Sequence, residues 1–204
     1  MAPLNGQEAA ASARAVQSND MVHASDQQPM QQHIWYVTGP AGCGKTTVAE
    51  YLAEALGIPY VEGDSYHTPA NVEKMRTGNP LTDTDRWEWL IGLRNESMHR
   101  ISGGASGVVV TCSALKRKYR DVLRVAKGVH THFIFLSAPA EVLLQRVSRR
   151  QGHYMGPGMV QSQFDILERP AADEHDVVSI DVSRSLQEVQ ADALARVSDM
   201  MGQD

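Results

Sequence analysis

The chain has 204 residues, of which 42% are hydrophobic and 21% charged, and its formal net charge is −5. This size and composition are typical of one globular domain with its own core. The chain is too short for two domains of ordinary size. The acidic balance argues against a general nucleic-acid binder, and no apolar run approaches the roughly 20 residues that cross a bilayer.

Residues 1–32 are rich in Ala, Gln and Ser and show no apolar period, so we predict a disordered leader. Arg14 is the only Lys or Arg in this segment. A mitochondrial transit peptide would be Arg-rich and a secretory signal would need an apolar core, so the leader fits neither class. The two cysteines, Cys43 and Cys112, make no disulfide framework and suggest buried thiols in a reducing compartment. We therefore expect a cytoplasmic protein.

An apolar run at 34–38 predicts the first strand, and a helical pattern begins nine residues later. The loop between them, Gly39-Pro-Ala-Gly-Cys-Gly-Lys-Thr46, matches the phosphate-binding pattern G-x-x-x-x-G-K-[ST] in the strand–loop–helix setting that this pattern requires. Gly39 and Gly44 permit the tight turn, and the loop amides together with the helix N-terminus favour an anion.

The loop predicts binding of a nucleoside triphosphate but leaves its use open. Lys45 is expected to reach the β- and γ-phosphates, and the Thr46 hydroxyl to ligate Mg²⁺. The predicted nucleotide-binding residues of the loop are Gly39, Pro40, Ala41, Gly42, Cys43, Gly44, Lys45, Thr46 and Thr47.

A short second strand is predicted at 58–61, and it runs into Glu62-Gly-Asp64-Ser-Tyr-His67. Alternation places Glu62 and Asp64 on one side of an extended segment. They lie just past the carboxyl end of a strand, where open α/β sheets bind ligands. Asp64 is therefore either a ligand-binding carboxylate or the N-cap of a following turn, and its position favours the first.

Two helices are predicted next, at 69–76 and from about 85 to 101. Trp87 and Trp89 cannot share one face of the second helix, so we expect one in the core and the other beside a pocket.

A continuous apolar run at 108–112 predicts a strand that is covered on both faces, and a basic helix follows at 117–124. Lys116 and Arg120 lie one turn apart just past that strand. They either face a ligand or belong to a solvated helix face.

The remaining pattern continues the alternation of strands and helices. Strands are predicted at 132–136 and 177–181, and helices at 139–150, 159–167 and 186–200. The basic end of the first of these helices leads into a Gly/Pro/His-rich loop, which predicts a mobile lid over about 147–160. The whole pattern predicts an α/β fold with a five-stranded parallel sheet and helices on both faces. No strand ends in a Walker B aspartate and no guanine-reading motif is present, which favours a small kinase over a GTPase switch.

Together these motifs resemble those of gluconokinases of the P-loop small-molecule kinase type, relatives of shikimate and nucleoside-monophosphate kinases. Beyond the phosphate loop, the matching blocks are Gly63-Asp-x-x-His67, Asn71-x-x-Lys-Met75, Gly78-x-Pro-Leu81, Asp83-x-Asp-Arg86 with Trp89-Leu90, Cys112-Ser-Ala-Leu-Lys116 with Tyr119-Arg-Asp121, Gly152-His153, and Ser162-Gln-Phe164 with Leu167-Glu168 and Pro170. The resemblance covers a single domain over 33–204 and leaves the leader outside.

The resemblance implies roles for matched residues. Lys45 would hold the β,γ-phosphates, Asp64 would orient or deprotonate the attacking hydroxyl, and Arg150 would reach the transferring phosphoryl group as the lid closes; these three are the implied catalytic residues. Arg146 would lie against the adenine. The implied substrate-binding residues are Asp64, His67, Lys74, Arg86, Lys116, Arg120, His153 and Gln163.

The implied activity is the ATP-dependent phosphorylation of the 6-hydroxyl of D-gluconate, giving 6-phospho-D-gluconate and ADP. ATP and Mg²⁺ would be the cofactors, and no nucleic acid or membrane is expected as a partner. A homodimer is one candidate state, because members of that family are often dimers. The alternatives are a kinase for another small hydroxy acid such as shikimate, a nucleoside-monophosphate kinase, and a non-catalytic ATP-binding module.

Overall fold

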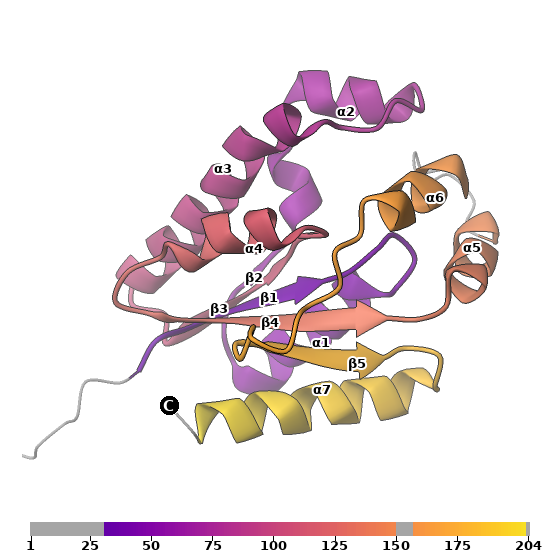
Figure 1. Ribbon diagram of the computed structural model, residues 1–204. Coiled ribbons are helices and arrows are strands. Elements are labelled where there is room, and N and C mark those ends of the chain that lie inside the picture. The colour runs from indigo at the N-terminus through magenta and orange to yellow at the C-terminus, as the bar shows by residue number, and fades with distance from the viewer. Residues whose placement is uncertain (1–30, 150–156, 203–204) are drawn as a thin grey trace, which may run out of the picture.

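The computed structural model describes residues 31–149 and 157–202. A parallel five-stranded sheet with the strand order β2-β3-β1-β4-β5 forms its centre (Figure 1). The strands are β1 (His33–Thr38), β2 (Tyr60–Val61), β3 (Gly107–Thr111), β4 (His130–Ser137) and β5 (Val177–Asp181). All five predicted strands are present, with shifted bounds. β2 begins at Tyr60, two residues later than predicted, because Pro59 has no N–H to donate to the ladder, and β4 begins two residues earlier than predicted.

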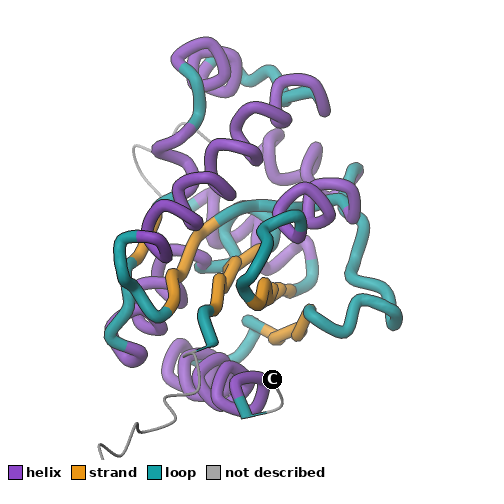
Figure 2. The backbone as a smooth tube through the Cα atoms, turned by 90° about the vertical axis from the view of Figure 1, so that its left-hand side faces the viewer, coloured by secondary structure: helices purple, strands orange, loops and turns teal. Residues whose placement is uncertain are grey.

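Helices cover both faces of the sheet, as predicted (Figures 1 and 2). On one face, α3 and α4 pack together, and on the other α1 packs against α7. The helices are α1 (Lys45–Leu56), α2 (Pro69–Arg76), α3 (Asp83–Ser102), α4 (Arg117–Arg124), α5 (Ala140–Ser148), α6 (Pro157–Asp165) and α7 (Leu186–Met201). None of the helices in the described residues is both long and apolar enough to cross a bilayer.

The central strand β1 contributes to two hydrophobic cores because successive side chains point to opposite faces. Trp35 and Val37 pack in the cluster formed with α1 and α7. Ile34 and Tyr36 pack in the cluster formed with α3 and α4. All six residues of β1 are buried, so the phosphate loop that follows it starts from a fully buried central strand.

The long helix α3 begins two residues earlier than predicted, because Thr82 and Asp85 form a reciprocal capping box. Its tryptophans correct one expectation. Trp89 is 2% exposed, and it belongs to the core and lines a pocket as well. Trp87 is 37% exposed and lies edge-on to Tyr119. The single indole of Trp89 therefore lies in the core and lines the pocket at once, whereas Trp87 does neither.

A buried ion pair ties α4 to the segment between α6 and β5. Arg120 donates through Nε and Nη2 to the two carboxylate oxygens of Glu174, both at 2.7 Å. The two side chains are 1% and 2% exposed. Arg124 binds the same carboxylate at 2.6 Å and also pairs with Asp176. The Arg120 guanidinium, and after it that of Arg124, lowers the pKa of Glu174 to about 2 against the opposing effect of burial.

This low pKa predicts a loss of stability in acid. The carboxylate contributes its full stabilisation above its ordinary pKa, near 4.5, and the contribution is lost as the pH falls toward about 2. Removing one partner of a buried pair costs about 3–5 kcal/mol at neutral pH, so Glu174→Gln should lie well below the native protein in urea unfolding at pH 7. That gap should narrow by roughly 3 kcal/mol by pH 2. Parallel pH curves for the two proteins would contradict the assignment.

Candidate active site

The phosphate loop connects β1 to α1 in the geometry that the sequence predicts. Gly39 and Gly44 adopt φ values of 132° and 91°, which residues with a Cβ rarely adopt. Gly44 stands at the N-cap of α1 without a side-chain cap, so the first amides of the helix are open to an anion. Lys45 Nζ folds back onto the carbonyl oxygens of Gly39 at 3.1 Å and Pro40 at 3.2 Å. The ammonium group is thereby held over the loop.

Helix α6 contacts the loop through Gln163. The Ala41 amide donates to Gln163 Oε1 at 2.7 Å, and the Gln163 residue is 6% exposed. A carboxamide oxygen therefore accepts a hydrogen bond from a loop amide, close to Lys45. This contact joins the phosphate loop to α6, whose first residues fall within the range predicted for the lid.

A narrow pocket opens beside the loop at the carboxyl ends of the strands. It is lined by Lys45, Asp64, His67, Met75, Leu81, Arg86, Trp89, Ser113 and Gln163. The sequence singled out the charged and amide residues of this set. It did not single out Ser113, Met75 or Leu81 as pocket residues, because their positions depend on how α2, α3 and the turn after β3 pack together.

Asp64 is fixed by a close approach between two backbones. A Cβ on Gly63 would lie 1.9 Å from the Thr111 carbonyl oxygen, so only glycine fits there. The Gly63 amide donates to Thr111 Oγ1 at 2.9 Å, and its carbonyl accepts from Trp89 Nε1 at 2.7 Å. The N-cap of this short 3-10 turn is Glu62, so Asp64 is not the cap. These contacts aim the segment at the pocket.

His67 and Arg86 complete the polar wall of the pocket. His67 stacks on Trp89 with ring centroids 4.2 Å apart, and burial, opposed by nearby Asp64, lowers its pKa to about 4. The imidazole is therefore neutral near pH 7. Arg86 is 8% exposed and donates through Nη1 to the carbonyl oxygens of Leu81 and Thr82. The pocket thus presents Arg86 and Lys45 as cations near one carboxylate.

Glu62 is a functional candidate to which the sequence gave little weight. Its carboxylate accepts hydrogen bonds from Thr46 Oγ1 at 2.9 Å, Tyr60 Oη at 2.5 Å and Thr111 Oγ1 at 2.5 Å. Burial favours the neutral acid, but the hydrogen bonds from Thr111, Tyr60 and Thr46 together outweigh it and lower the pKa of Glu62. The sequence held one sign of this role: Glu62 and Asp64 are expected on the same side of the chain just past the end of a strand. The structure places an ionised carboxylate next to the Thr46 hydroxyl.

Three predicted substrate cations are not brought to this pocket. Lys74 pairs with Asp85 at 2.6 Å, and Lys116 pairs with Asp83 at 2.9 Å. Arg120 is fully buried in its pair with Glu174. The acidic partners occur in the block around Arg86 and far along the chain, and their pairing is not visible from sequence spacing. Arg86 is therefore the arginine that lines this pocket.

A second pocket lies on another side of the phosphate loop and contains Arg146. Its volume is about 160 Å³, and Cys43, Gly44, Thr47, Arg146 and Leu186 are among its lining residues. Arg146 Nη2 donates to the Val182 carbonyl oxygen at 2.7 Å, which holds the guanidinium at the pocket wall. Burial raises the pKa of the Cys43 thiol, so this cysteine is a neutral packing residue as expected. Arg150 and His153 lie outside the described residues.

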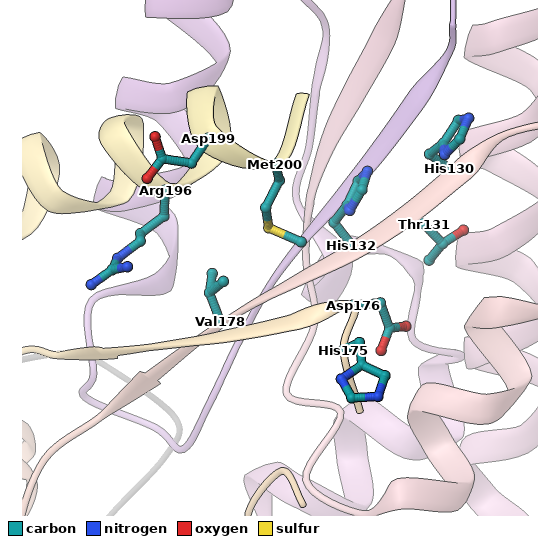
Figure 3. Close-up of a pocket in the computed structure, with 9 residues that line it drawn as sticks. All are labelled: His130, Thr131, His132, His175, Asp176, Val178, Arg196, Asp199 and Met200. Atoms are coloured by element: carbon teal, nitrogen blue, oxygen red, sulfur yellow. The ribbon is translucent and has the colours of Figure 1, made fainter. Parts of the chain in front are cut away.

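A larger cavity of about 440 Å³ lies at the opposite end of the sheet (Figure 3). It is bordered by the start of β4, by the segment before β5 and by the end of α7, from which Arg196 and Asp199 come. Parallel α/β sheets bind ligands beyond the carboxyl ends of their strands. The size of this cavity therefore does not make it the active site, and the smaller pocket beside Lys45 is the candidate.

Comparison with known proteins shows the family to which this chain belongs. The family model described as an AAA domain matches residues 34–169. A probable gluconokinase of Schizosaccharomyces pombe is 44% identical over 177 residues, which are 85% of this chain and 92% of that protein. The thermosensitive gluconokinase of Escherichia coli K12 is 40% identical over 78% of this chain and 84% of its own.

The solved structures agree with the sequence relatives. A gluconokinase from Sinorhizobium meliloti 1021 superposes with a TM-score of 0.75 and 40% identity, covering 86% of this chain and 97% of that one. The APS kinase CysC of Mycobacterium tuberculosis, at 20% identity and a TM-score of 0.59 over 85% of this chain and 99% of its own, shares the fold alone. The chain therefore belongs to the AAA domain family of nucleotide-binding proteins and, within it, to the gluconokinases.

Proposed function

We propose that this protein transfers the γ-phosphoryl group of ATP to the 6-hydroxyl of D-gluconate, releasing 6-phospho-D-gluconate and ADP. One observation carries the proposal: Lys45 of the phosphate loop, the Asp64 carboxylate and the Arg86 guanidinium line one pocket. A sugar acid needs a cation for its carboxylate and an acceptor for its hydroxyl, and this pocket offers both. Arg86 can bind the carboxylate with two parallel hydrogen bonds, which distinguishes an acid from a neutral sugar.

Phosphoryl transfer depends on positioning and charge neutralisation more than on covalent chemistry. Lys45 and the loop amides hold the phosphates, so the ammonium group leaves the carbonyl oxygens of Gly39 and Pro40 when ATP binds. Asp64 accepts a hydrogen bond from the attacking hydroxyl and orients it for in-line attack. Arg150, at the predicted lid of about 147–160, is proposed to neutralise charge on the phosphoryl group in flight.

The residues around Thr46 fit a magnesium ion. Thr46 Oγ1 lies 2.9 Å from Glu62 Oε2, and oxygen donors of this kind are those that Mg²⁺ prefers. Within the described residues no group of three or more His, Cys, Asp or Glu side chains could hold a metal by itself. Thr46, with Glu62 beside it, would hold the ion, which supplies positive charge to the phosphates when bound.

An ADP-release assay with separate acceptors tests the proposal. Purified protein with Mg²⁺-ATP is offered D-gluconate, shikimate, glucose and AMP in turn. We expect turnover with gluconate alone: glucose lacks the carboxylate that Arg86 would bind, and the relatives of this chain argue against shikimate and AMP. Turnover with shikimate or AMP would replace the proposed acceptor while leaving a kinase. Binding of ATP without turnover of any acceptor would favour a non-catalytic ATP-binding module.

Arg146→Ala provides a separate prediction for the nucleotide side. An arginine stacked on an aromatic ring contributes about 1–2 kcal/mol when partly desolvated, so the KM for ATP should rise about 10-fold. The KM for gluconate should stay within twofold, because Arg146 lines the other pocket. Arg196→Ala is the matched control, since its side chain is more than half exposed and lies at the opposite end of the sheet. Equal rises in both KM values would contradict an adenine contact.

We further propose a cytoplasmic homodimer that binds neither nucleic acid nor membrane. Trp87 and Ile91 stand one turn apart on α3 and are 37% and 41% exposed, which supports a contact surface there. Light scattering after gel filtration should give twice the chain mass, and Trp87→Ala/Ile91→Ala should give the monomer mass. Residues 1–32 are proposed to be a leader outside the domain, whose bounds would be 33–204.

A further inference from the structure

We propose that Arg120, held by Glu174, is a positioning residue that sets the turn after β3 against both the phosphate loop and the acceptor pocket. The inference rests on the proposed function and deepens it. It replaces the expectation that Arg120 binds substrate, because the guanidinium is fully buried and is bound on three sides by the protein itself.

The turn after β3 is the structure that needs support. Ala114 has a φ of 38°, and it is the only residue other than glycine with a positive φ in the described part of the chain. That conformation is unfavourable for an L-residue and persists only where neighbours hold it. Arg120 Nη1 donates to the Ala114 carbonyl oxygen at 3.2 Å, so the guanidinium is one of those neighbours.

The same turn touches both halves of the active site. The Ser113 carbonyl oxygen accepts from the Gly39 amide at 3.2 Å, at the first residue of the phosphate loop. Ser113 also lines the acceptor pocket with Asp64 and Arg86. A shift of this turn would therefore move the phosphate loop and the pocket wall relative to each other. Transfer between two bound molecules is sensitive to such a shift, since a misplacement of 1 Å reduces the rate about 100-fold.

The chain that leaves α6 runs down toward the sheet (Figure 1), and Arg120 connects it to the turn. Its Nη1 donates to the Glu168 carbonyl oxygen at 3.2 Å, and the Glu168 amide donates to the Leu115 carbonyl oxygen at 2.8 Å. Helix α6 carries Gln163, which binds the Ala41 amide of the phosphate loop. One guanidinium thus fixes the turn after β3 and the base of the helix that contacts the loop.

Glu174 determines where the guanidinium points. Its carboxylate accepts hydrogen bonds from Nε and Nη2 of Arg120. Nη1 is then directed at the carbonyl oxygens of Ala114 and Glu168. Glu174 does not line the acceptor pocket. A direct substrate role for Arg120 and a positioning role therefore predict different effects of changing Glu174.

Steady-state kinetics on purified full-length variants tests the proposal at 15 °C, where marginal variants stay folded, with near-ultraviolet circular dichroism as the folding check. We expect Glu174→Gln and Arg120→Lys each to lower kcat by about 10- to 100-fold. The double variant Arg120→Met/Glu174→Leu leaves no lone buried charge of the pair and should fold. Its kcat should fall by no more than that of the worse single variant, because the two residues act as one unit.

Asp173→Asn is the matched control. Asp173 precedes Glu174 and pairs with Arg117, which lies in α4 as Arg120 does. The side chains of Asp173 and Arg117 are 62% and 47% exposed. The control should keep kcat within twofold. A folded double variant with native kcat would overturn the proposal. It would also be overturned if Arg120→Lys raised only the KM for gluconate while Glu174→Gln had native kinetics. Lower melting temperatures with unchanged kcat would likewise reduce the pair to a structural role.

Hydrogen exchange gives a readout that does not depend on turnover. The Gly39 and Glu168 amides, which bind the turn at Ser113 and Leu115, should lose protection in Glu174→Gln and keep it in Asp173→Asn. If the native protein does not phosphorylate gluconate, the proposed function fails while this exchange result still decides whether Arg120 holds the turn. Unchanged protection at both amides in the variant would overturn the proposal.

Discussion

Asp64→Asn is expected to lower kcat for gluconate phosphorylation by about 100- to 10,000-fold, the range that a positioned acid or base contributes. The Asn side chain keeps the shape of the carboxylate but can neither take the proton nor attract it strongly. The KM for ATP should change little, because Asp64 lines the acceptor pocket rather than the pocket of Arg146. Single-turnover measurements with saturating ATP separate the transfer step from product release.

The matched control for this change is Asp181→Asn. Asp181 also ends a strand, β5, but it is exposed and accepts the Ser183 amide at 2.9 Å. The control should keep kcat within twofold. A loss below 10-fold in Asp64→Asn would assign Asp64 to substrate orientation alone, because a loose transition state needs little help from a base.

Lys45→Met is expected to reduce kcat by about 1,000-fold, since one preorganised donor to developing charge is worth about 100- to 1,000-fold and this donor carries a full charge. Methionine fills the same space along the loop without the ammonium group. ATP affinity, measured by titration, should fall as well, because the charge contacts the phosphates before and during transfer. The protein should stay folded, since the ammonium group contacts only carbonyl oxygens at the loop.

Lys127→Met is the control for charge removal. Lys127 is exposed on the loop before β4, and this variant should have native kinetics. If Lys45→Met kept more than a tenth of the native kcat, the phosphate loop would serve binding alone. The non-catalytic ATP-binding module would then regain its place among the functions considered.

The sequence was sufficient for the features that depend on short-range order. The apolar runs predicted all five parallel strands, and the loop from Gly39 to Thr46 predicted the nucleotide site. These signals are local because strand burial, glycine conformations and helix caps are decided within about ten residues. The comparisons confirmed the family that the motif blocks resemble, with gluconokinases 36–44% identical to this chain.

Tertiary structure alone decided which charged side chains line the pocket beside Lys45. Lys74, Lys116 and Arg120 stood in matched motif blocks like Arg86, and the resemblance implied a substrate contact for all four. Folding brings Asp85, Asp83 and Glu174 to the first three, whereas Arg86 lines the pocket beside Lys45. Those pairings span 11, 33 and 54 residues of chain, beyond any local pattern. Only the packing of α3, α4 and the segment before β5 distinguishes the arginine of the pocket from the arginine that holds the turn.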